Sequence, residues 1–331
     1  MADARYDVLG IGNALVDVLV SVEDAFLSAE SLPKGGMMLV EADQSDALYA
    51  KLGPATERSG GSCGNTMAGL AALGGRGAYI GKVRDDAFGK VFRHDLTTLG
   101  VAFETEPATD AAPTGKCLVL VSPDAQRTMV TYLGAATELT AADIDRAAIG
   151  AAQVTYLEGY LFDRDEAKRA FIAAADAAHS AGREVSLTLS DGFCVDRHRD
   201  AFLSLVEDHV DILFANESEI TSLYQVDGFD AALQKVRGHC QVACLTRSEK
   251  GSVVLSGEEV HVIDAEPVAR VVDTTGAGDQ YAAGFLYGYT QGLDLATAGR
   301  IGSIAAAEVV SHYGARPDAD LKALAAKVLA A

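Results

Sequence analysis

From residue 140 to residue 255 the chain alternates short apolar runs with helix-like stretches, and this alternation restricts its fold more than any other feature. The apolar runs that we interpret as strands are 154–157, 185–189, 212–215, 242–246 and 253–255. Helical patterns separate most of these runs, and the longest is the Ala-rich stretch 163–181. Repeated strand–helix alternation predicts a parallel sheet covered by helices on both faces. Ligands of such sheets bind outside the carboxyl ends of the strands.

The first part of the chain has a different pattern. Residues 6–12 are typical of a first strand that ends in a tight glycine turn, so the core begins close to the N-terminus. Four further strand-like runs flank polar segments, at 15–20, 37–41, 116–121 and 128–133. We interpret them as a small β-sheet lid formed by segments of approximately 14–45 and 105–135. The length is compatible with one large α/β domain over 1–331 that carries this appendage.

Charge and cysteine content exclude several classes of function. With 47 acidic and 27 basic residues the net charge is −20, and the resulting field repels nucleic acid and anionic membranes. The five cysteines are scattered and odd in number, which argues against a disulfide framework. We find no signal-peptide pattern and no apolar stretch that approaches the length of a membrane span. We therefore expect a cytoplasmic metabolic protein that acts on a small molecule.

The segment 273–279 reads Asp-Thr-Thr-Gly-Ala-Gly-Asp and combines a small-residue turn, a helix start and a carboxylate. If a helix begins near Ala277, the N–H groups of Gly276, Ala277 and Gly278 are free and form an anion hole at the positive end of the helix. Asp279 could then accept a proton from a substrate hydroxyl that attacks a phosphoryl group. The alternative is a Gly-rich turn with an acidic residue that merely favours a helix N-terminus.

Common nucleotide-binding loops are absent. The early G-x-G lacks the third glycine of a dinucleotide fingerprint because position 15 is Leu, and no G-x-x-x-x-G-K-[ST] loop occurs. If ATP binds, the turn at Thr275–Gly278 has to hold its phosphates.

Two polar pairs follow predicted strands. Asn13 and Asp17 leave the first strand and suit a vicinal diol, although local turn contacts are an alternative. Asn216 and Glu219 lie at a strand-to-helix junction, where a helix N-cap with a capping box is a strong alternative to a ligand site.

Two glycine-rich motifs together point to a family. Residues 60–66 read Gly-Gly-Ser-Cys-Gly-Asn-Thr before a helix-like stretch, and the segment 273–279 follows roughly two hundred residues later. The chain resembles the ribokinase-like (PfkB) family of carbohydrate and nucleoside kinases over essentially its whole length. The resemblance implies a three-layer α/β/α sandwich with a mostly parallel central sheet and a small β-sheet lid. It also implies ATP and Mg²⁺ as cofactors.

The resemblance assigns roles to individual residues. Asp17, Gly61 and Asn65 match positions that bind sugar or ribose hydroxyls, and Asn13 accompanies them. Arg127 resembles an arginine that reaches over the reacting phosphate, although a charge at a strand edge is an equally good explanation. The nucleotide and metal side comprises Asn216, Glu219 acting on Mg²⁺ through water, Thr246, Gly251, Thr275, and Asp273 for a K⁺ site beside residues 311–315.

The acceptor is less constrained than the reaction. Residues 12–17 look like the start of the adenosine-kinase-like branch, with Ala14 and Gly64 as departures from it. The resemblance favours transfer of the γ-phosphoryl group of ATP to the 5′-hydroxyl of adenosine or a related ribonucleoside. A kinase for fructose, ribose or a related sugar is the alternative, and a catalytically silent ligand-binding protein is a third. Apolar residues available for a base pocket, or for ordinary core, are Met37, Met38, Leu39, Cys117, Val119, Leu133 and Phe162. Exposed lid strands could pair between subunits, so both monomer and homodimer stay open.

Overall fold

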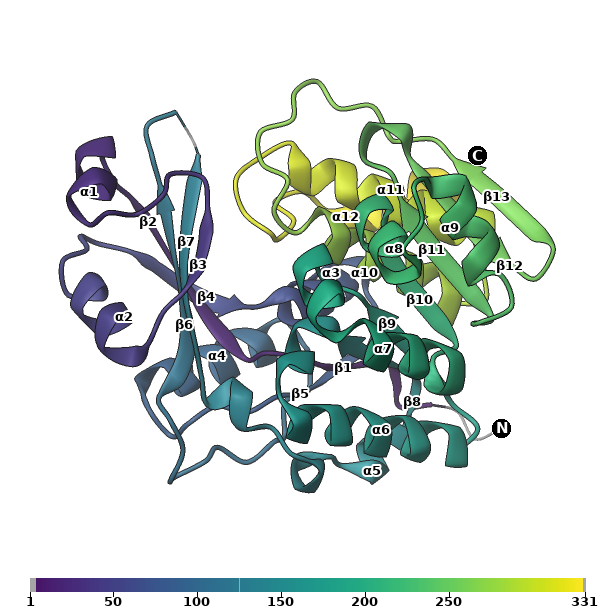
Figure 1. Ribbon diagram of the computed structural model, residues 1–331, viewed down its shortest axis with the longest axis horizontal. Coiled ribbons are helices and arrows are strands. Elements are labelled where there is room, and N and C mark those ends of the chain that lie inside the picture. The colour runs from purple at the N-terminus through teal and green to yellow at the C-terminus, as the bar shows by residue number, and fades with distance from the viewer. Residues whose placement is uncertain (1–3, 125, 330–331) are drawn as a thin grey trace.

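The computed structural model describes residues 4–124 and 126–329, and it is built on two β-sheets (Figure 1). The larger sheet has eight strands in the order β13-β12-β11-β10-β9-β8-β1-β5. All neighbours from β5 to β11 are parallel, whereas β12 and β13 run antiparallel to theirs. The strands are β1 (Tyr6–Ile11), β5 (Gly77–Ile80), β8 (Ala152–Glu158), β9 (Glu184–Thr188), β10 (Ile212–Asn216), β11 (Val242–Thr246), β12 (Ser252–Ser256) and β13 (Glu259–Ile263). The five strands expected between residues 140 and 255 are all present.

Helices cover both faces of the larger sheet. One face carries α5 (Arg146–Gly150), α6 (Asp165–Ser180), α7 (Gly192–His209), α8 (Glu217–Tyr224) and α9 (Phe229–Val236). The other carries α3 (Ser62–Leu73), α10 (Ala277–Thr290) and α11 (Leu295–Val310), with α12 (Leu321–Leu329) packed on α3 and α11. The central strands are buried along nearly their whole length and are mostly apolar rather than alternating, as cover on both faces requires. The expected three-layer sandwich is confirmed.

The smaller sheet has five strands in the order β3-β7-β6-β2-β4 and stands apart from the helical layers at the left of Figure 1. Its strands are β2 (Leu15–Ser21), β3 (Met37–Leu39), β4 (Thr56–Gly60), β6 (Thr114–Val121) and β7 (Arg127–Gly134). The helices beside it are α1 (Asp24–Ala29), α2 (Ala42–Tyr49) and α4 (Ala87–Thr98). Four strands lie in the two segments that we expected to form the lid, and β4 lies between those segments. β4 was not predicted because Thr-Glu-Arg-Ser-Gly lacks the apolar residues typical of a strand.

Strand alternation gives the smaller sheet two different faces. Along β2, Val16 and Val18 are fully buried in the core that continues beneath α3 and α4. Leu15, Asp17 and Leu19 point to the opposite face, because successive side chains of a strand alternate. This alternation is what presents the Asp17 carboxylate to a ligand site.

The remaining structural features are four 3₁₀ turns, the state of the cysteines and the character of the helices. Thr140 and Asp143 form a capping box, which starts the 3₁₀ turn η2 (Ala141–Asp143). The other 3₁₀ turns are η1 (Ala135–Glu138), η3 (Gly159–Asp163) and η4 (Ser248–Lys250). All five cysteines carry free thiols. No helix in the described part of the chain combines the length and apolar character needed to cross a bilayer.

Candidate active site

A cavity of about 1310 Å³ lies between the smaller sheet and the carboxyl ends of the larger sheet's strands. The residues that end or follow parallel strands and line it are Asn13, Glu158, Thr188, Asn216 and Thr246. The smaller sheet closes the cavity on the other side with its Asp17-bearing face. The position at the carboxyl edge of the sheet is the one that the parallel topology predicted.

The turn before α10 is built on a left-handed glycine. Gly276 has φ 79° and ψ 0°, the values of the third residue of a type II turn, and α10 begins at the next residue, Ala277. A Cβ at this position would lie 2.6 Å from the Cα of Ala315, so only glycine fits. The Ala277 N–H donates across this turn to the Thr274 carbonyl at 3.2 Å. The expectation of three free amides is therefore wrong for Ala277, because the tight turn uses that donor itself.

The amides of Gly276 and Gly278 have no acceptor within the described residues, and both residues line the cavity. Thr275 is held by its own N–H, which donates to Asp273 Oδ1 at 3.0 Å. The turn thus leaves two outward donors at the positive end of a fourteen-residue helix.

Asp279 lies in the first turn of α10 and has two hydrogen-bond donors from α3. Ser62 Oγ donates to its Oδ1 at 2.6 Å, and Asn65 Nδ2 donates to its Oδ2 at 3.2 Å. Burial raises the pKa of Asp279 to about 6, although these two donors act in the opposite direction, and the charge of Asp17 adds to the increase. Asn65 Oδ1 is buried with no partner among the described residues, so it can still accept from a ligand hydroxyl.

The junction that delivers Ser62 and Asn65 depends on Gly61. This residue caps α3 with φ 79°, and a Cβ there would approach the Asn13 carbonyl oxygen to 2.4 Å. Ser62 lies within the glycine-rich motif 60–66, but the sequence alone assigned it no role. Its position directly after Gly61 was the one sign that its hydroxyl could belong to the site.

Asp17 faces the cavity among three arginines. Burial raises the pKa of Asp17 to about 6, while the guanidinium groups of Arg316, Arg58 and Arg127 act to lower it. Arg58 is its cross-strand neighbour in the β2–β4 pair and also lines the cavity. Sequence reasoning missed Arg58 and Arg316, because neither belongs to a recognisable motif.

Arg127 forms a buried ion pair with Asp273, with Nη1 2.8 Å from Oδ2. Asp273 also accepts hydrogen bonds from the N–H groups of Thr275, at 3.0 Å, and Gly314, at 3.1 Å. A carboxylate neutralised by a guanidinium is a poor ligand for a monovalent cation, so the K⁺ site expected at Asp273 does not fit this arrangement. Arg127 Nε and Nη2 are buried without partners among the described residues, and the side chain lines the cavity.

Glu158 is a buried site residue that the sequence did not reveal. It ends β8 and is 1% exposed. Its Oε1 accepts from Asn13 Nδ2 at 2.7 Å, and its Oε2 accepts from the N–H groups of Cys63 at 2.8 Å and Asn13 at 3.3 Å. Burial raises its pKa to about 7, against these hydrogen bonds. Asn13 is therefore oriented by Glu158 at the edge of the cavity.

The residues expected on the nucleotide side, Asn216, Glu219, Thr246, Gly251 and Thr275, all line the cavity. Asn216 and Glu219 form a complete capping box on α8, so the structural alternative is present. Both also line the cavity, and burial raises the pKa of Glu219 to about 7. Thr246 ends β11, beside Asn216 in register. Gly251 has φ 79°, and a Cβ there would overlap the Ile263 carbonyl.

The smaller sheet contributes an apolar wall, which we define as Leu15, Leu19, Met37, Leu39, Val119 and Leu133. Leu39 is 55% exposed and Met37 is 51% exposed, so these two side chains present apolar area to the cavity. Two residues proposed for a base pocket do not belong to it. Met38 packs against the core on the opposite face of β3, and Phe162 stacks on Phe202, with ring centroids 4.3 Å apart, under the other face of the larger sheet.

Comparison with known proteins agrees with this architecture. Residues 37–322 match the model of the pfkB family carbohydrate kinases. Adenosine kinase of Saccharomyces cerevisiae is 28% identical over 92% of this chain and 94% of its own. Two solved structures superpose with a TM-score of 0.90: a probable sugar kinase from Rhizobium etli, 46% identical, covering 98% of each chain, and adenosine kinase from Sinorhizobium meliloti, 47% identical, covering 98% of this chain and 99% of the other. The chain therefore belongs to the pfkB family of carbohydrate kinases, phosphotransferases whose acceptor is an alcohol group.

Proposed function

We propose that this protein transfers the γ-phosphoryl group of ATP to the 5′-hydroxyl of adenosine or a related ribonucleoside. One observation carries the proposal. The Asp279 carboxylate and the free turn amides lie in the same cavity as the apolar wall, in which Met37 and Leu39 are exposed. The first two suit phosphoryl transfer, and the wall suits a nucleobase.

Asp279 is the proposed general base. With a pKa raised to about 6 by burial, it is ionised at neutral pH yet more basic than an ordinary aspartate. Ser62 and Asn65 fix its orientation, so the oxygen lone pairs that remain face the acceptor hydroxyl. The amides of Gly276 and Gly278 would hold the negative charge of the transferred group.

The acceptor ribose is assigned to Asp17 and Asn65. An ionised Asp17 accepts hydrogen bonds from two vicinal hydroxyls, and the unpartnered Oδ1 of Asn65 accepts another. Gly61 lets the backbone approach the sugar. Arg127 supports the phosphate side, because two of its nitrogens are buried without partners in the described structure.

Magnesium fits the residues at the nucleotide end. No group of three or more His, Cys, Asp or Glu side chains among the described residues could hold a metal ion directly. Mg²⁺ keeps most of its water and binds chiefly to phosphates, so a single buried carboxylate suits it. Glu219 would hold a metal-bound water, with Asn216 fixing the carboxylate. When bound, the ion would neutralise phosphate charge at this end of the cavity.

A sugar kinase is the second candidate, because one of the two equally similar solved structures is called a probable sugar kinase. A free hexose or pentose would leave Met37 and Leu39 without a partner. Burial of apolar area stabilises binding by about 25 cal/mol per Å². The wall therefore favours an acceptor that carries a base.

The test is ADP release from Mg·ATP with adenosine, guanosine, inosine, ribose and fructose as acceptors. We expect turnover with adenosine, and turnover with free sugars alone would refute the acceptor assignment. Leu39→Asn probes the wall, and Val262→Asn is its matched control on β13, outside the cavity and 73% exposed. Leu39→Asn should raise KM for adenosine, whereas Val262→Asn should keep the wild-type KM. Equal KM values for both variants would mean that the wall does not contact the acceptor.

A further inference from the structure

We propose that Arg316 is a positioning residue that holds the β4–α3 junction against the turn before α10, and so keeps Ser62 and Asn65 on the Asp279 carboxylate. The inference rests on the proposed function of Asp279 as the base. Arg316 lines the cavity and its charge acts on Asp17, but no hydrogen bond joins it to Asp279 in the described structure. Its effect on the base is assigned to the two segments that carry Ser62, Asn65 and Asp279.

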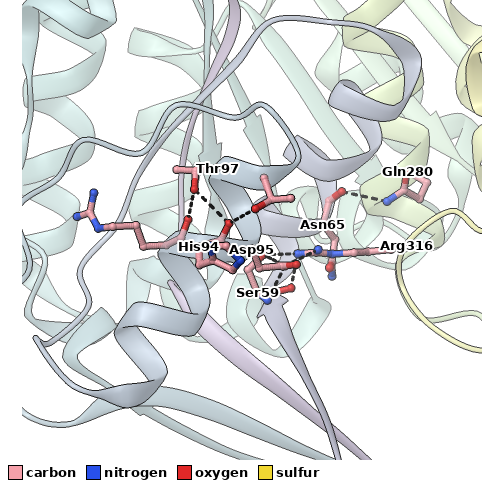
Figure 2. Close-up of polar contacts among 9 residues, drawn as sticks. Ser59, Asn65, His94, Asp95, Thr97, Gln280 and Arg316 are labelled. Atoms are coloured by element: carbon pink, nitrogen blue, oxygen red, sulfur yellow. Dashed lines mark hydrogen bonds and ion pairs between the residues drawn. The ribbon is translucent and has the colours of Figure 1, made fainter.

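The guanidinium of Arg316 connects to the smaller sheet and to α4 (Figure 2). It is 9% exposed and donates from Nη1 to Asp95 Oδ2 at 2.8 Å. From Nη2 it donates to the carbonyl and the hydroxyl oxygens of Ser59. Asp95 Oδ2 also accepts from the Ser59 hydroxyl at 2.6 Å and from the Ser59 N–H at 2.9 Å. Burial raises the pKa of Asp95, but the Ser59 hydroxyl and Arg316 outweigh it and hold that pKa below its usual range.

Ser59 is the residue through which Arg316 and Asp95 contact the β4–α3 junction. It lies near the end of β4, and after Gly60 and Gly61 the helix α3 begins at Ser62. Two glycines give a chain that bends easily, so the direction of α3 depends on what holds the strand before it. Fixing Ser59 therefore fixes the position from which Ser62 and Asn65 reach Asp279.

The backbone beside Arg316 connects to the other segment. Ala315 packs so closely on Gly276 that a Cβ there would lie 2.6 Å from the Ala315 Cα. The Ala315 carbonyl accepts from Gln280 Nε2 at 3.0 Å, and the same nitrogen donates to the Asn65 carbonyl at 3.0 Å. Figure 2 shows Gln280 reaching toward Asn65 on the side opposite Ser59. Ala315 and Arg316 thus connect α10, which carries Asp279, to the segment that leads into α3, which carries Ser62 and Asn65.

Stability alone is a weak reason for this arrangement. Arg316 Nε is buried without a partner in the described structure, and burial lowers the pKa of the guanidinium, although Asp95 acts to raise it. Replacing a buried ion pair by apolar residues is often neutral or stabilising. The fork geometry of arginine, which reaches Ser59 and Asp95 together, matters more for position than a point charge would.

The experiment compares Arg316→Lys and Asp95→Asn with Arg76→Lys. Arg76 makes a similar arginine–carboxylate pair with Asp7, but at the amino end of the larger sheet, away from the cavity. Displacement of a reacting group by about 1 Å costs on the order of 100-fold in rate. We expect kcat to fall by about 10- to 100-fold in the first two variants, with a smaller change in KM, and to stay at the wild-type value in Arg76→Lys.

Two further readouts separate positioning from loss of stability. Because Ser62 and Asn65 lower the pKa of Asp279, weakening their contacts should move the acid limb of kcat to higher pH. Hydrogen exchange of the amides in 62–66 should become faster in Arg316→Lys but not in Arg76→Lys. The exchange arm needs no substrate, so it tests the inference even if no nucleoside is phosphorylated. Unchanged exchange and an unchanged acid limb in Arg316→Lys would overturn the inference, as would an equal loss of kcat in Arg76→Lys.

Discussion

Replacing Asp279 by Asn should make the protein more stable and nearly inactive. Burial raises the pKa of this carboxyl from 3.8 to about 6, so keeping it ionised at neutral pH opposes folding. One pKa unit corresponds to about 1.4 kcal/mol, which gives an upper limit of about 3 kcal/mol. The side chain is half-buried rather than enclosed, so we expect about 1–2 kcal/mol. The side chain should be accommodated, because Asn65 can turn its unpartnered Oδ1 toward the new amide.

The sign of this effect with pH is fixed by linkage. The folded carboxyl holds its proton up to about pH 6, whereas the unfolded one releases it near 3.8, so the carboxyl lowers stability as pH rises through that interval. The advantage of Asp279→Asn should be absent below about pH 4 and fully developed above about pH 7. For a chain of this length, 1–2 kcal/mol corresponds to an increase in Tm of about 1.5–3 °C.

The assay is thermal unfolding between pH 4 and pH 8, with turnover measured in parallel. Loss of a general base should lower kcat by about 10²- to 10⁴-fold. Asp294→Asn is the control with opposite sign, because hydrogen bonds from Thr297 hold the pKa of that exposed N-cap carboxyl below its usual value. A Tm difference for Asp279→Asn that is independent of pH, or wild-type kcat in that variant, would refute the reasoning.

Three further predictions concern the same cavity. Asp17→Asn should raise KM for the acceptor by about 10- to 100-fold while KM for ATP stays constant, because a charged hydrogen bond to a hydroxyl contributes about 1.5–3 kcal/mol; equal KM values would exclude contact. Gly276→Ala should lower the free energy of unfolding by about 2–4 kcal/mol in denaturant titration, since φ is 79° and Ala315 blocks the Cβ, whereas Gly278→Ala, with open space, should be neutral. Burial raises the pKa of Glu158 to about 7, so the wild type should lose stability as pH rises from about 4.5 to 7, and Glu158→Gln should lose less over that interval in thermal unfolding.

Much of the fold could be predicted because its signals are local. Each central strand contains a short, mostly apolar run, and each helix that follows has its own period, so alternation alone indicated a parallel sheet with two helical layers. Three strands were missed. β5 is a buried run of only four residues, Gly-Ala-Tyr-Ile; β4 is polar, and β13 lies at the sheet edge with most of its residues outside the core. Edge strands need not be apolar, so their composition resembles that of a loop.

The features of the site likewise separate into those set by adjacent residues and those set by packing. The sequence by itself determined the glycine turn, the start of α10 at Ala277 and the carboxylate in its first turn, because backbone conformation and helix start depend on adjacent residues. Only the tertiary structure decided which distant groups meet in and around the cavity. Glu158 lies 145 positions from Asn13, Arg316 lies 257 positions from Ser59, and Arg127 meets Asp273 across the cavity. Such contacts are set by how layers pack, and the type of a residue and its neighbours in the chain do not specify which remote partner packing will supply.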